Sequence, residues 1–328
     1  MIKQSVYVFI LSFLLTVVSG KTFITLMRKK KAGQPILKYV ETHKDKSGTP
    51  TMGGLFFILS AIITFLIFKN SQTRLSIVAL FIGLSYMIVG FLDDAIKIKS
   101  KDNLGLKAYQ KIFFQLAIAI ASGVFVYTNG LTAFYIPFTM RKVEIGIFSV
   151  PVVVFIFLAI TNSVNLTDGL DGLASNTSVV YLLFLSLLIY LQSIMAGDNK
   201  TVNIEYENLI FLSISLVGAL SGFLVFNTNK ASIFMGDTGS LSLGGFIGSI
   251  SIFSSNSFYI PILGIMFVVS CISVIVQVVY FKKTKKRVFL MAPLHHHFQM
   301  KGYSEQKISY IYSVITAILG LFCIIIYL

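Results

Sequence analysis

The sequence predicts an all-α integral membrane protein with about ten transmembrane helices, and three observations support this fold class. The 328 residues are 55% hydrophobic and only 12% charged, with a mean hydropathy of +0.84, which is outside the range of soluble globular domains. The apolar residues form uninterrupted blocks close to the roughly 20 residues that a helix needs to cross a bilayer. The basic residues gather in alternate loops between these blocks, as expected of a multi-pass membrane protein.

The predicted spans are apolar segments separated by polar loops. Their bounds are Ser5 to Met27, Met52 to Phe68, Leu75 to Leu92, Ile112 to Tyr127, Phe148 to Asn165, Leu173 to Met195, Asn208 to Phe226, Leu241 to Phe253, Phe258 to Phe281 and Ile308 to Leu328. The first ends at a basic run without a small-residue cleavage site, so we expect a span and not a secretion signal. The eighth is short and rich in glycine, which permits close helix packing. No repeat or soluble segment interrupts the chain, so residues 1–328 are expected to form one transmembrane domain.

An even number of spans puts both termini on one side of the membrane, and the basic residues indicate which side. Twenty of the 27 Lys and Arg residues lie in one set of alternate loops and six in the other. Because cytoplasmic loops are enriched in Lys and Arg, these twenty predict cytoplasmic loops and extracytoplasmic termini. The same rule accounts for the net charge of +14, so we expect no nucleic-acid partner. Cys271 and Cys323 lie in apolar blocks and predict neither a disulfide nor a metal site.

Five of the thirteen acidic residues lie in three loops at predicted cytoplasmic span ends. An Asp at the centre of a span costs about 2.5–3.5 kcal/mol, so the ends are inexpensive places for an acid. Solvated helix ends would explain one or two acids, but these five lie in strings rich in Gly and Asn with apolar flanks. They are Asp93, Asp94, Asp168, Asp171 and Asp237, and we interpret them as functional.

The first two strings suit cation and ligand binding. FLDDAIKIK holds Asp93 and Asp94, with Lys97 one helical turn after Asp93; adjacent acids beside lysines suit Mg²⁺ binding or general-base work. NSVNLTDGLDGLA begins at Asn162, and the glycines after its two acids allow backbone to approach a ligand closely. Asn165 and both acids can coordinate or hydrogen-bond that ligand. The loop is too short for an EF-hand.

The remaining strings suit phosphate. In FMGDTGSLSLGG, Asp237 lies between glycines, and the TGS and GG residues are predicted to offer backbone N–H groups to phosphate, although the P-loop spacing is absent. APLHHHFQMKG contains His295, His296 and His297, whose directions on a helix differ by about 100° per residue, so they cannot all face one ion. Hydrogen bonding of phosphate or hydroxyl by one or two of them is favoured over a zinc site. HKDKSGTPTMGG joins lysines to a Gly-Thr-Pro turn.

Five motifs resemble those of the phospho-N-acetylmuramoyl-pentapeptide transferase family, in that family's order: HKDKSGTPTMGG, DDAIKI, NLTDGLDGLA, FMGDTGS and APLHHHF. The family belongs to the polyprenyl-phosphate N-acetylhexosamine-1-phosphate transferases, and the ten-span topology agrees with it over the whole chain. The resemblance implies transfer of phospho-N-acetylmuramoyl-pentapeptide from its UDP-linked form to undecaprenyl phosphate, with release of UMP and formation of lipid I for peptidoglycan. It also implies a Mg²⁺ requirement, a homodimer, and a bacterial plasma-membrane location with the active site facing the cytoplasm.

The resemblance also implies roles for individual residues. Asp237 resembles the principal Mg²⁺ ligand, and Asp93 and Asp94 resemble an acidic pair with general-base or metal-linked roles. The residues that resemble the uridine pocket are Asn165, Gly169, Leu170 and Asp171, with Asp168 beside them and Phe234 as the aromatic residue that stacks on uracil. The further polar contacts implied are Lys97, Lys111, His296 and His297 in catalysis, and Lys46, Asn227, Gln277 and His295 in substrate binding.

Three alternatives stay open at this point. The nearest is a related transferase that uses UDP-N-acetylglucosamine, although the APLHHHF string favours the muramoyl enzyme. A transporter or channel is the alternative from another class, but transporters tend to carry charged residues near the bilayer midplane and these acids lie at one face. A purely structural membrane protein would not require Asp-Gly-rich loops at three span ends.

Overall fold

The computed structural model describes residues 1–29, 48–71, 73–100, 104–195, 200–228 and 230–328, and nearly all of its regular structure is helical. The helices are α1 (Ile2–Lys29), α2 (Gly54–Phe68), α3 (Arg74–Ser100), α4 (Ala108–Thr128), α5 (Ser149–Thr167), α6 (Leu173–Met195), α7 (Lys200–Asn227), α8 (Gly236–Phe253), α9 (Ile260–Leu263), α10 (Ile265–Thr284), α11 (Leu294–Met300) and α12 (Glu305–Ile324). Each of the ten predicted spans overlaps a helix or, for the ninth, a pair of helices.

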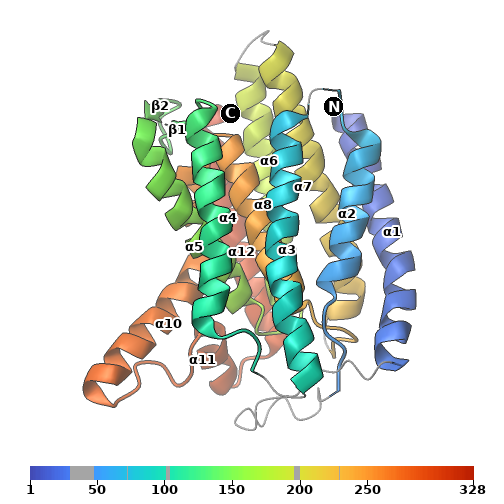
Figure 1. The fold of residues 1–328 in the computed structure, drawn as a ribbon, viewed down its shortest axis with the longest axis vertical. Coiled ribbons are helices and arrows are strands. Elements are labelled where there is room, and N and C mark those ends of the chain that lie inside the picture. Colours follow the sequence, from blue (N-terminus) through green and yellow to red (C-terminus); the bar gives the residue numbers. More distant parts are fainter. Residues whose placement is uncertain (30–47, 72, 101–103, 196–199, 229) are drawn as a thin grey trace.

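Successive long helices run in opposite directions, which divides their ends between two poles of the bundle (Figure 1). Both chain termini lie at the pole where α3 begins. The opposite pole holds the C-terminal ends of α1, α3, α5 and α7, the first turn of α8, and α11. The bundle therefore gathers the strings that carry the five acids and the histidines at one pole, far from the termini. We call this end of the bundle the acidic pole.

Within the described part of the chain, eight helices are long and apolar enough to cross a membrane: α1, α3, α4, α5 with the short 3₁₀ turn before it, α6, α7, α10 and α12. Two of the ten predicted spans fall short of this measure. Helix α2 is apolar but has only 15 residues, and α8 is rich in Gly and Ser. The structure thus confirms a helical, multi-pass architecture, with two shorter helices among the longer ones.

Helix α8 lies at the centre of the bundle and depends on glycine contacts. Every residue from Thr238 to Phe253 is buried. A Cβ on Gly90 of α3 would lie 2.1 Å from the Asp237 carbonyl oxygen, and one on Gly54 of α2 would lie 2.3 Å from Gly239 Cα. Any side chain at Gly54 or Gly90 would therefore push α2 or α3 away from α8. A Cβ on Gly244 of α8 itself would lie 2.5 Å from Thr161 Cα of α5, which confirms the close packing predicted for the glycines of the eighth span.

Two details of the regular structure were not predicted. The all-α prediction missed a two-stranded antiparallel hairpin, β1 (Ala133–Tyr135) with β2 (Lys142–Glu144), at the pole of the termini. Three-residue strands leave too little alternation in the sequence to be detected. The ninth span is not continuous, because Gly264 (φ −96°, ψ 24°) leaves helical geometry and separates α9 from α10.

Helix α10 leaves the bundle and carries α11 beside the acidic pole (Figure 1). The Gln277 side chain holds the returning loop: its Oε1 accepts from the backbone N–H groups of Val288 and Phe289, both at 3.0 Å, and its Nε2 donates to the Phe289 carbonyl at 3.1 Å. Ser273 Oγ accepts from the Leu294 N–H at 2.9 Å. These bonds fix α11 relative to α10.

Candidate active site

The centre of the acidic pole is Asp237, in the first turn of α8. Its Oδ2 accepts from Lys97 Nζ of α3 at 3.1 Å and from Lys111 Nζ of α4 at 2.8 Å. Its Oδ1 accepts from Asn165 Nδ2, near the end of α5, at 2.8 Å. Asn165 also donates to Ser240 Oγ at 2.8 Å. Four helices therefore meet at one carboxylate, and the sequence prediction that these residues act together is consistent with their contacts.

The neighbouring Asp94 is buried and caps α8 from α3. Its Oδ1 accepts from the Asp237 N–H at 3.2 Å, and its Oδ2 accepts from the Thr238 N–H at 2.9 Å and from Thr238 Oγ1 at 2.6 Å. A carboxylate at a helix N-terminus satisfies N–H groups that have no partner within the helix and lies at the positive end of the helix dipole. The first residue of α8 has to be glycine, because the φ of Gly236 is +72° and a Cβ there would lie 2.5 Å from Asp94 Oδ2.

This cap overturns one prediction about phosphate. The TGS backbone was expected to offer its N–H groups to phosphate, but the Thr238 N–H donates to Asp94 instead. Gly244 and Gly245 lie in the buried interior of α8, away from its N-terminus. A carboxylate from another helix, far away in the sequence, has taken the position that the local motif suggested for an anion.

Asp93 differs from Asp94 in its contacts. Its Oδ1 accepts from the Leu106 N–H at 2.9 Å, and its Oδ2 lies 2.5 Å from Lys97 Nζ. Asp93 therefore faces the lysine and the chain that leads into α4, whereas both oxygens of Asp94 are used by α8. Gly105 packs directly against the Asp93 carboxylate, because a Cβ there would lie 2.5 Å from Asp93 Oδ1.

The three carboxylates could hold a metal ion. One oxygen from each of Asp93, Asp94 and Asp237 lies within 4.8 Å of the others. Carboxylate oxygens are the ligands that Mg²⁺ prefers, and Mg²⁺ takes one or two of them together with substrate phosphates. The three acids outnumber the two lysines, so the cluster keeps an excess of negative charge for a cation. The donor set thus fits a hard divalent ion.

The loop from Asp168 to Gly172 lies next to this cluster. Burial is the largest of the effects that raise the pKa of Asp168 well above its ordinary value. The nearby carboxylates of Asp237, Asp94 and Asp171 raise it further. Asp171 Oδ2 accepts from the Ala231 N–H at 3.0 Å, and the Asp171 N–H donates to Glu305 Oε2 at 2.9 Å. The two acids of the loop therefore differ. The surroundings of Asp168 raise its pKa, whereas the hydrogen bonds of Asp171 hold the loop against Ala231 and against Glu305.

Asn227 also holds this loop. Its Oδ1 accepts from the Gly172 N–H at 3.1 Å, and its Nδ2 donates to the Ile233 carbonyl at 2.9 Å. The side chain is buried at the end of α7, between the loop and the segment that leads to α8. Asn227 Oδ1 also accepts from Ser175 Oγ at 3.4 Å, and a direct contact of Asn227 with substrate stays a prediction.

The histidines lie on α11 and the first of them packs against the loop. A Cβ on Gly169 would lie 2.4 Å from His295 Nε2, so only glycine allows this contact. His295 is fully buried, and neither ring nitrogen has a hydrogen-bond partner within the described part of the chain. Burial, with a smaller contribution from His296, lowers the pKa of His295 well below its ordinary value and keeps the ring neutral.

The other two histidines are held differently. His296 Nδ1 is 2.9 Å from Gln299 Oε1, and His297 Nδ1 accepts from the Leu290 N–H at 3.1 Å. The bond at Nδ1 puts the proton of neutral His297 on Nε2, which is then a hydrogen-bond donor. The three rings therefore have different surroundings.

Three more predicted site residues, Phe234, Leu170 and Gln277, each lie in a different environment. Phe234 is partly exposed just before α8, and its backbone pairs with the Pro50 carbonyl at 2.8 Å and the Gly53 N–H at 2.9 Å. Leu170 is buried in a small apolar cluster with Leu173 and Tyr312. Gln277 has its side chain committed to the loop before α11, as described above. Lys46 lies outside the described residues.

Side chains for which the sequence predicted no role also build the pole. Thr238 and Ser240 are hydrogen-bonded to Asp94 and Asn165, as given above, and Glu305 joins the Asp171 loop to α12. Glu305 Oε1 also accepts from Gln299 Nε2 of α11 at 3.4 Å. Glu305 follows Ser304, and a Ser before an acid is a typical helix start, so the sequence could have identified the start of α12 but not the loop that Glu305 contacts.

Comparisons with known proteins find similar sequences along nearly the whole chain. A family model described as glycosyl transferase family 4 matches residues 76–255, and a phospho-N-acetylmuramoyl-pentapeptide-transferase signature matches residues 46–58. The chain is 46% identical to a phospho-N-acetylmuramoyl-pentapeptide-transferase from Clostridium botulinum (strain Alaska E43 / Type E3), over 96% of this chain and 93% of that protein. It is 40% identical to the proteins of that name from Clostridioides difficile (99% and 98% covered) and Caldanaerobacter subterraneus subsp. tengcongensis (97% of each).

Proposed function

The chain belongs to the phospho-N-acetylmuramoyl-pentapeptide-transferase family, and from that membership we propose that it makes lipid I. It is a phosphoglycosyl transferase of peptidoglycan synthesis: it transfers phospho-N-acetylmuramoyl-pentapeptide from the UDP-linked donor to undecaprenyl phosphate and releases UMP. The observation that carries this proposal is the meeting of Asp93, Asp237, Lys97 and Lys111 at one pole of a membrane bundle. Acids for a metal and cations for phosphates are what phosphoryl transfer requires.

The proposed reaction exchanges one phosphorus–oxygen bond for another. An oxygen of the lipid phosphate attacks the β-phosphorus of the UDP donor, and the bond from that phosphorus to the bridging oxygen breaks, so that UMP leaves with that oxygen. Lys97 and Lys111 stabilise the phosphoryl charge and hold the two phosphates in line. Their ammonium groups contact Asp237 in the structure and would turn towards substrate oxygens when the donor binds.

We assign the metal ligands by their contacts. Asp237 is proposed as the principal ligand of Mg²⁺, with Asp93 beside it, because both oxygens of Asp94 are already used by α8. When bound, Mg²⁺ neutralises the charge of the donor pyrophosphate. Asp93 or Asp94 is proposed as the proton acceptor, as the resemblance implies, whereas burial and the neighbouring carboxylates raise the pKa of Asp168 and favour its uncharged form. Phe234 and the loop from Asn165 to Asp171 are proposed to hold the uridine.

The substrate proposal is tested by donor discrimination. Purified protein with Mg²⁺ and undecaprenyl phosphate is expected to release UMP from UDP-N-acetylmuramoyl-pentapeptide at least about a hundredfold faster than from UDP-N-acetylglucosamine, since a site built to bind a substituent rejects donors that lack it. Radiolabelled UMP is the measured product. The reverse preference would assign the chain to the sister transferase, and a folded sample that uses neither donor would favour a transporter.

The orientation of the pole is also a proposal. The basic loops and the soluble UDP donor both favour a cytoplasmic acidic pole, in a bacterial plasma membrane, with the termini outside. Single cysteines at Lys69 and Lys99, in a variant whose native cysteines are replaced by Ala, are expected to label from opposite sides in intact cells. Only the Lys69→Cys variant should react with an impermeant reagent, and reaction of both variants would contradict the topology. A homodimer, implied by resemblance alone, also stays a prediction.

A further inference from the structure

A pair of amide side chains joins α4 to α5 farther into the bundle than the contacts of Asp237. Gln115 Oε1 accepts from Asn162 Nδ2 at 2.9 Å, and Gln115 Nε2 donates to Asn162 Oδ1 at 3.5 Å. Asn162 Nδ2 also donates to the Leu158 carbonyl at 2.8 Å, and Gln115 is fully buried. Because each amide uses the donor and the acceptor of the other, the pair holds the two helices at one relative position.

Tyr86 connects this pair to α3 and to α8. Its hydroxyl donates to the Gln115 carbonyl at 3.2 Å. Its ring stacks on Phe157 of α5 with the centroids 5.8 Å apart, and a Cβ on Gly245 of α8 would lie 2.7 Å from Tyr86 Cδ2. This buried tyrosine of α3 therefore contacts the other three helices that meet at Asp237. We call Tyr86, Gln115 and Asn162 the second polar layer.

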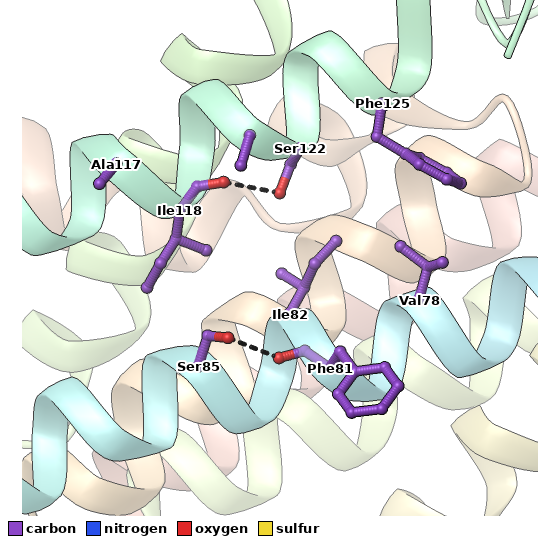
Figure 2. Close-up of a pocket in the computed structure, with 9 residues that line it drawn as sticks. Val78, Phe81, Ile82, Ser85, Ala117, Ile118, Ser122 and Phe125 are labelled. Carbon is purple, nitrogen blue, oxygen red and sulfur yellow. Dashed lines mark hydrogen bonds between the residues drawn. The ribbon is translucent and has the colours of Figure 1, made fainter. Parts of the chain in front are cut away.

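Side-chain packing does little to hold α3 against α4. Helix α3 packs mainly on α8, and α4 packs mainly on α5. A hollow of about 400 Å³, lined by α3 and α4, separates the two helices on the side away from the acidic pole (Figure 2). The hydroxyls of Ser85 and Ser122 in its lining donate to carbonyls of their own helices, both at 2.8 Å. The relative position of α3 and α4 therefore depends strongly on the hydrogen bond from Tyr86 to Gln115.

The two amides lie in line with two of the side chains that donate to Asp237. Residues three or four apart on a helix share a face, so Gln115 lies one turn below Lys111, and Asn162 lies one turn below Asn165. Lys111 donates to one oxygen of Asp237 and Asn165 donates to the other, both at 2.8 Å. The amide pair therefore joins the same two helix faces that meet again at the Asp237 carboxylate.

The third donor to Asp237, Lys97, has a similar relation to Tyr86. Eleven residues are close to three turns of a helix, so these two side chains point within about 20° of each other, with Lys97 about 16 Å nearer the acidic pole. Each of α3, α4 and α5 therefore carries one donor to Asp237 and one member of the second polar layer on the same face. A shift of any of these helices would move its donor relative to the carboxylate.

We propose that Tyr86, Gln115 and Asn162 are positioning residues, which keep the three donors to Asp237 in place during phosphoryl transfer. The inference rests on the proposed function, in which two of these donors are lysines that turn towards substrate oxygens. Their contacts with Asp237 are lost at that moment, so these contacts no longer hold the helices together. The hydrogen bonds of the second polar layer contain no group that turns to the substrate, and they keep α3, α4 and α5 in register while the reaction proceeds.

Breaking the amide pair tests the proposal. Gln115→Leu removes the amide and keeps a side chain of similar size. The kcat for UMP release is expected to fall about thirtyfold, because a small displacement of groups that position the reactants is costly in the transition state. KM for the donor and KM for undecaprenyl phosphate are expected to change less than about twofold, because the loss is confined to the transition state.

The matched control is Gln192→Leu, at the pole of the termini. Gln192 and Asn256 form another reciprocal amide pair, with Gln192 Nε2 donating at 2.8 Å and Asn256 Nδ2 donating at 2.9 Å, and both residues are buried. The control breaks a pair of the same kind far from Asp237. It is expected to lower the midpoint of thermal unfolding, as Gln115→Leu does, and to leave kcat unchanged.

Two further variants carry the test if Gln115→Leu does not fold. Exchange of the amides, Gln115→Asn with Asn162→Gln, preserves the number of atoms between α4 and α5. Each single substitution is expected to lower kcat about tenfold, and the exchange is expected to restore it to within about threefold of the wild type. Tyr86→Phe removes only the hydroxyl and is expected to lower kcat about threefold.

The outcomes separate a positioning role from a purely structural one. A kcat for Gln115→Leu equal to that of Gln192→Leu would overturn the inference, and so would an exchange variant no faster than the single substitutions. A higher KM with an unchanged kcat would also overturn it, because the pair would then act on substrate binding. Wild-type protein that releases no UMP from the UDP donor would instead overturn the proposed function.

Discussion

Replacing Asp237 with Asn is expected to lower the rate of UMP release by about a thousandfold or more at saturating Mg²⁺. Asn has the same size, but it lacks the charge that binds Lys97, Lys111 and a metal ion. Its amide would also present N–H groups to two ammonium groups or to Asn165, which donates to Oδ1 in the native chain. The measurement is kcat for UMP release, together with thermal unfolding to establish that the variant is folded.

The matched control is Glu144→Gln, which removes a carboxylate on the exposed strand β2 at the opposite pole. Its rate is expected to equal that of the wild type. An Asp237→Asn variant with a rate close to that of this control would exclude Asp237 from the mechanism and would move the metal to Asp93.

Replacing Asp94 with Asn is expected to lower the rate about a hundredfold, through the position of Asp237. The amide can accept from one of the α8 N–H groups, but its own N–H group faces the other, so the first turn of α8 shifts. Thr238→Val removes one of the three bonds to Asp94 and is expected to lower the rate about tenfold. Both variants should need more Mg²⁺ for half-maximal rate.

The pair of variants separates a positioning role from direct chemistry. If Asp94 only positions α8, the pH dependence of kcat/KM is unchanged in Thr238→Val and in the residual activity of Asp94→Asn. If Asp94 accepts a proton itself, Thr238→Val will be close to wild type and Asp94→Asn will abolish one limb of the pH profile.

The sequence predicted most of the helices, because hydropathy in a membrane protein depends on local composition. It predicted the members of the active site less completely. Asp237, Lys97, Lys111 and Asn165 stood out as polar residues at span ends, but their mutual contacts depend on how four helices pack. The Asp94 cap on α8 joins residues 143 and 144 positions apart, and no local pattern indicates such a pairing.

Backbone geometry limited the prediction elsewhere. The break at Gly264 and the hairpin at β1 and β2 each involve only a few residues, too few to change an apolar or alternating pattern. The resemblance implies a substrate contact for Gln277; in the structure its side chain is hydrogen-bonded to the loop before α11, and the substrate contact stays a prediction. A polar side chain within a transmembrane span can hydrogen-bond backbone groups of its own chain as readily as it can bind a ligand.

The composition of α8 has a consequence for biosynthesis. Eleven of its 18 residues are Gly, Ser, Thr or Asp, and it is not among the helices apolar enough to cross a membrane by themselves. A segment of this kind gains little from contact with lipid and must be stabilised by other helices as it leaves the translocon. Helices α2 and α3 precede α8 in the chain and are synthesised first. The glycine contacts that α8 makes with them provide that stabilisation. Insertion of the catalytic helix is therefore a cooperative event that depends on helices already in the bilayer.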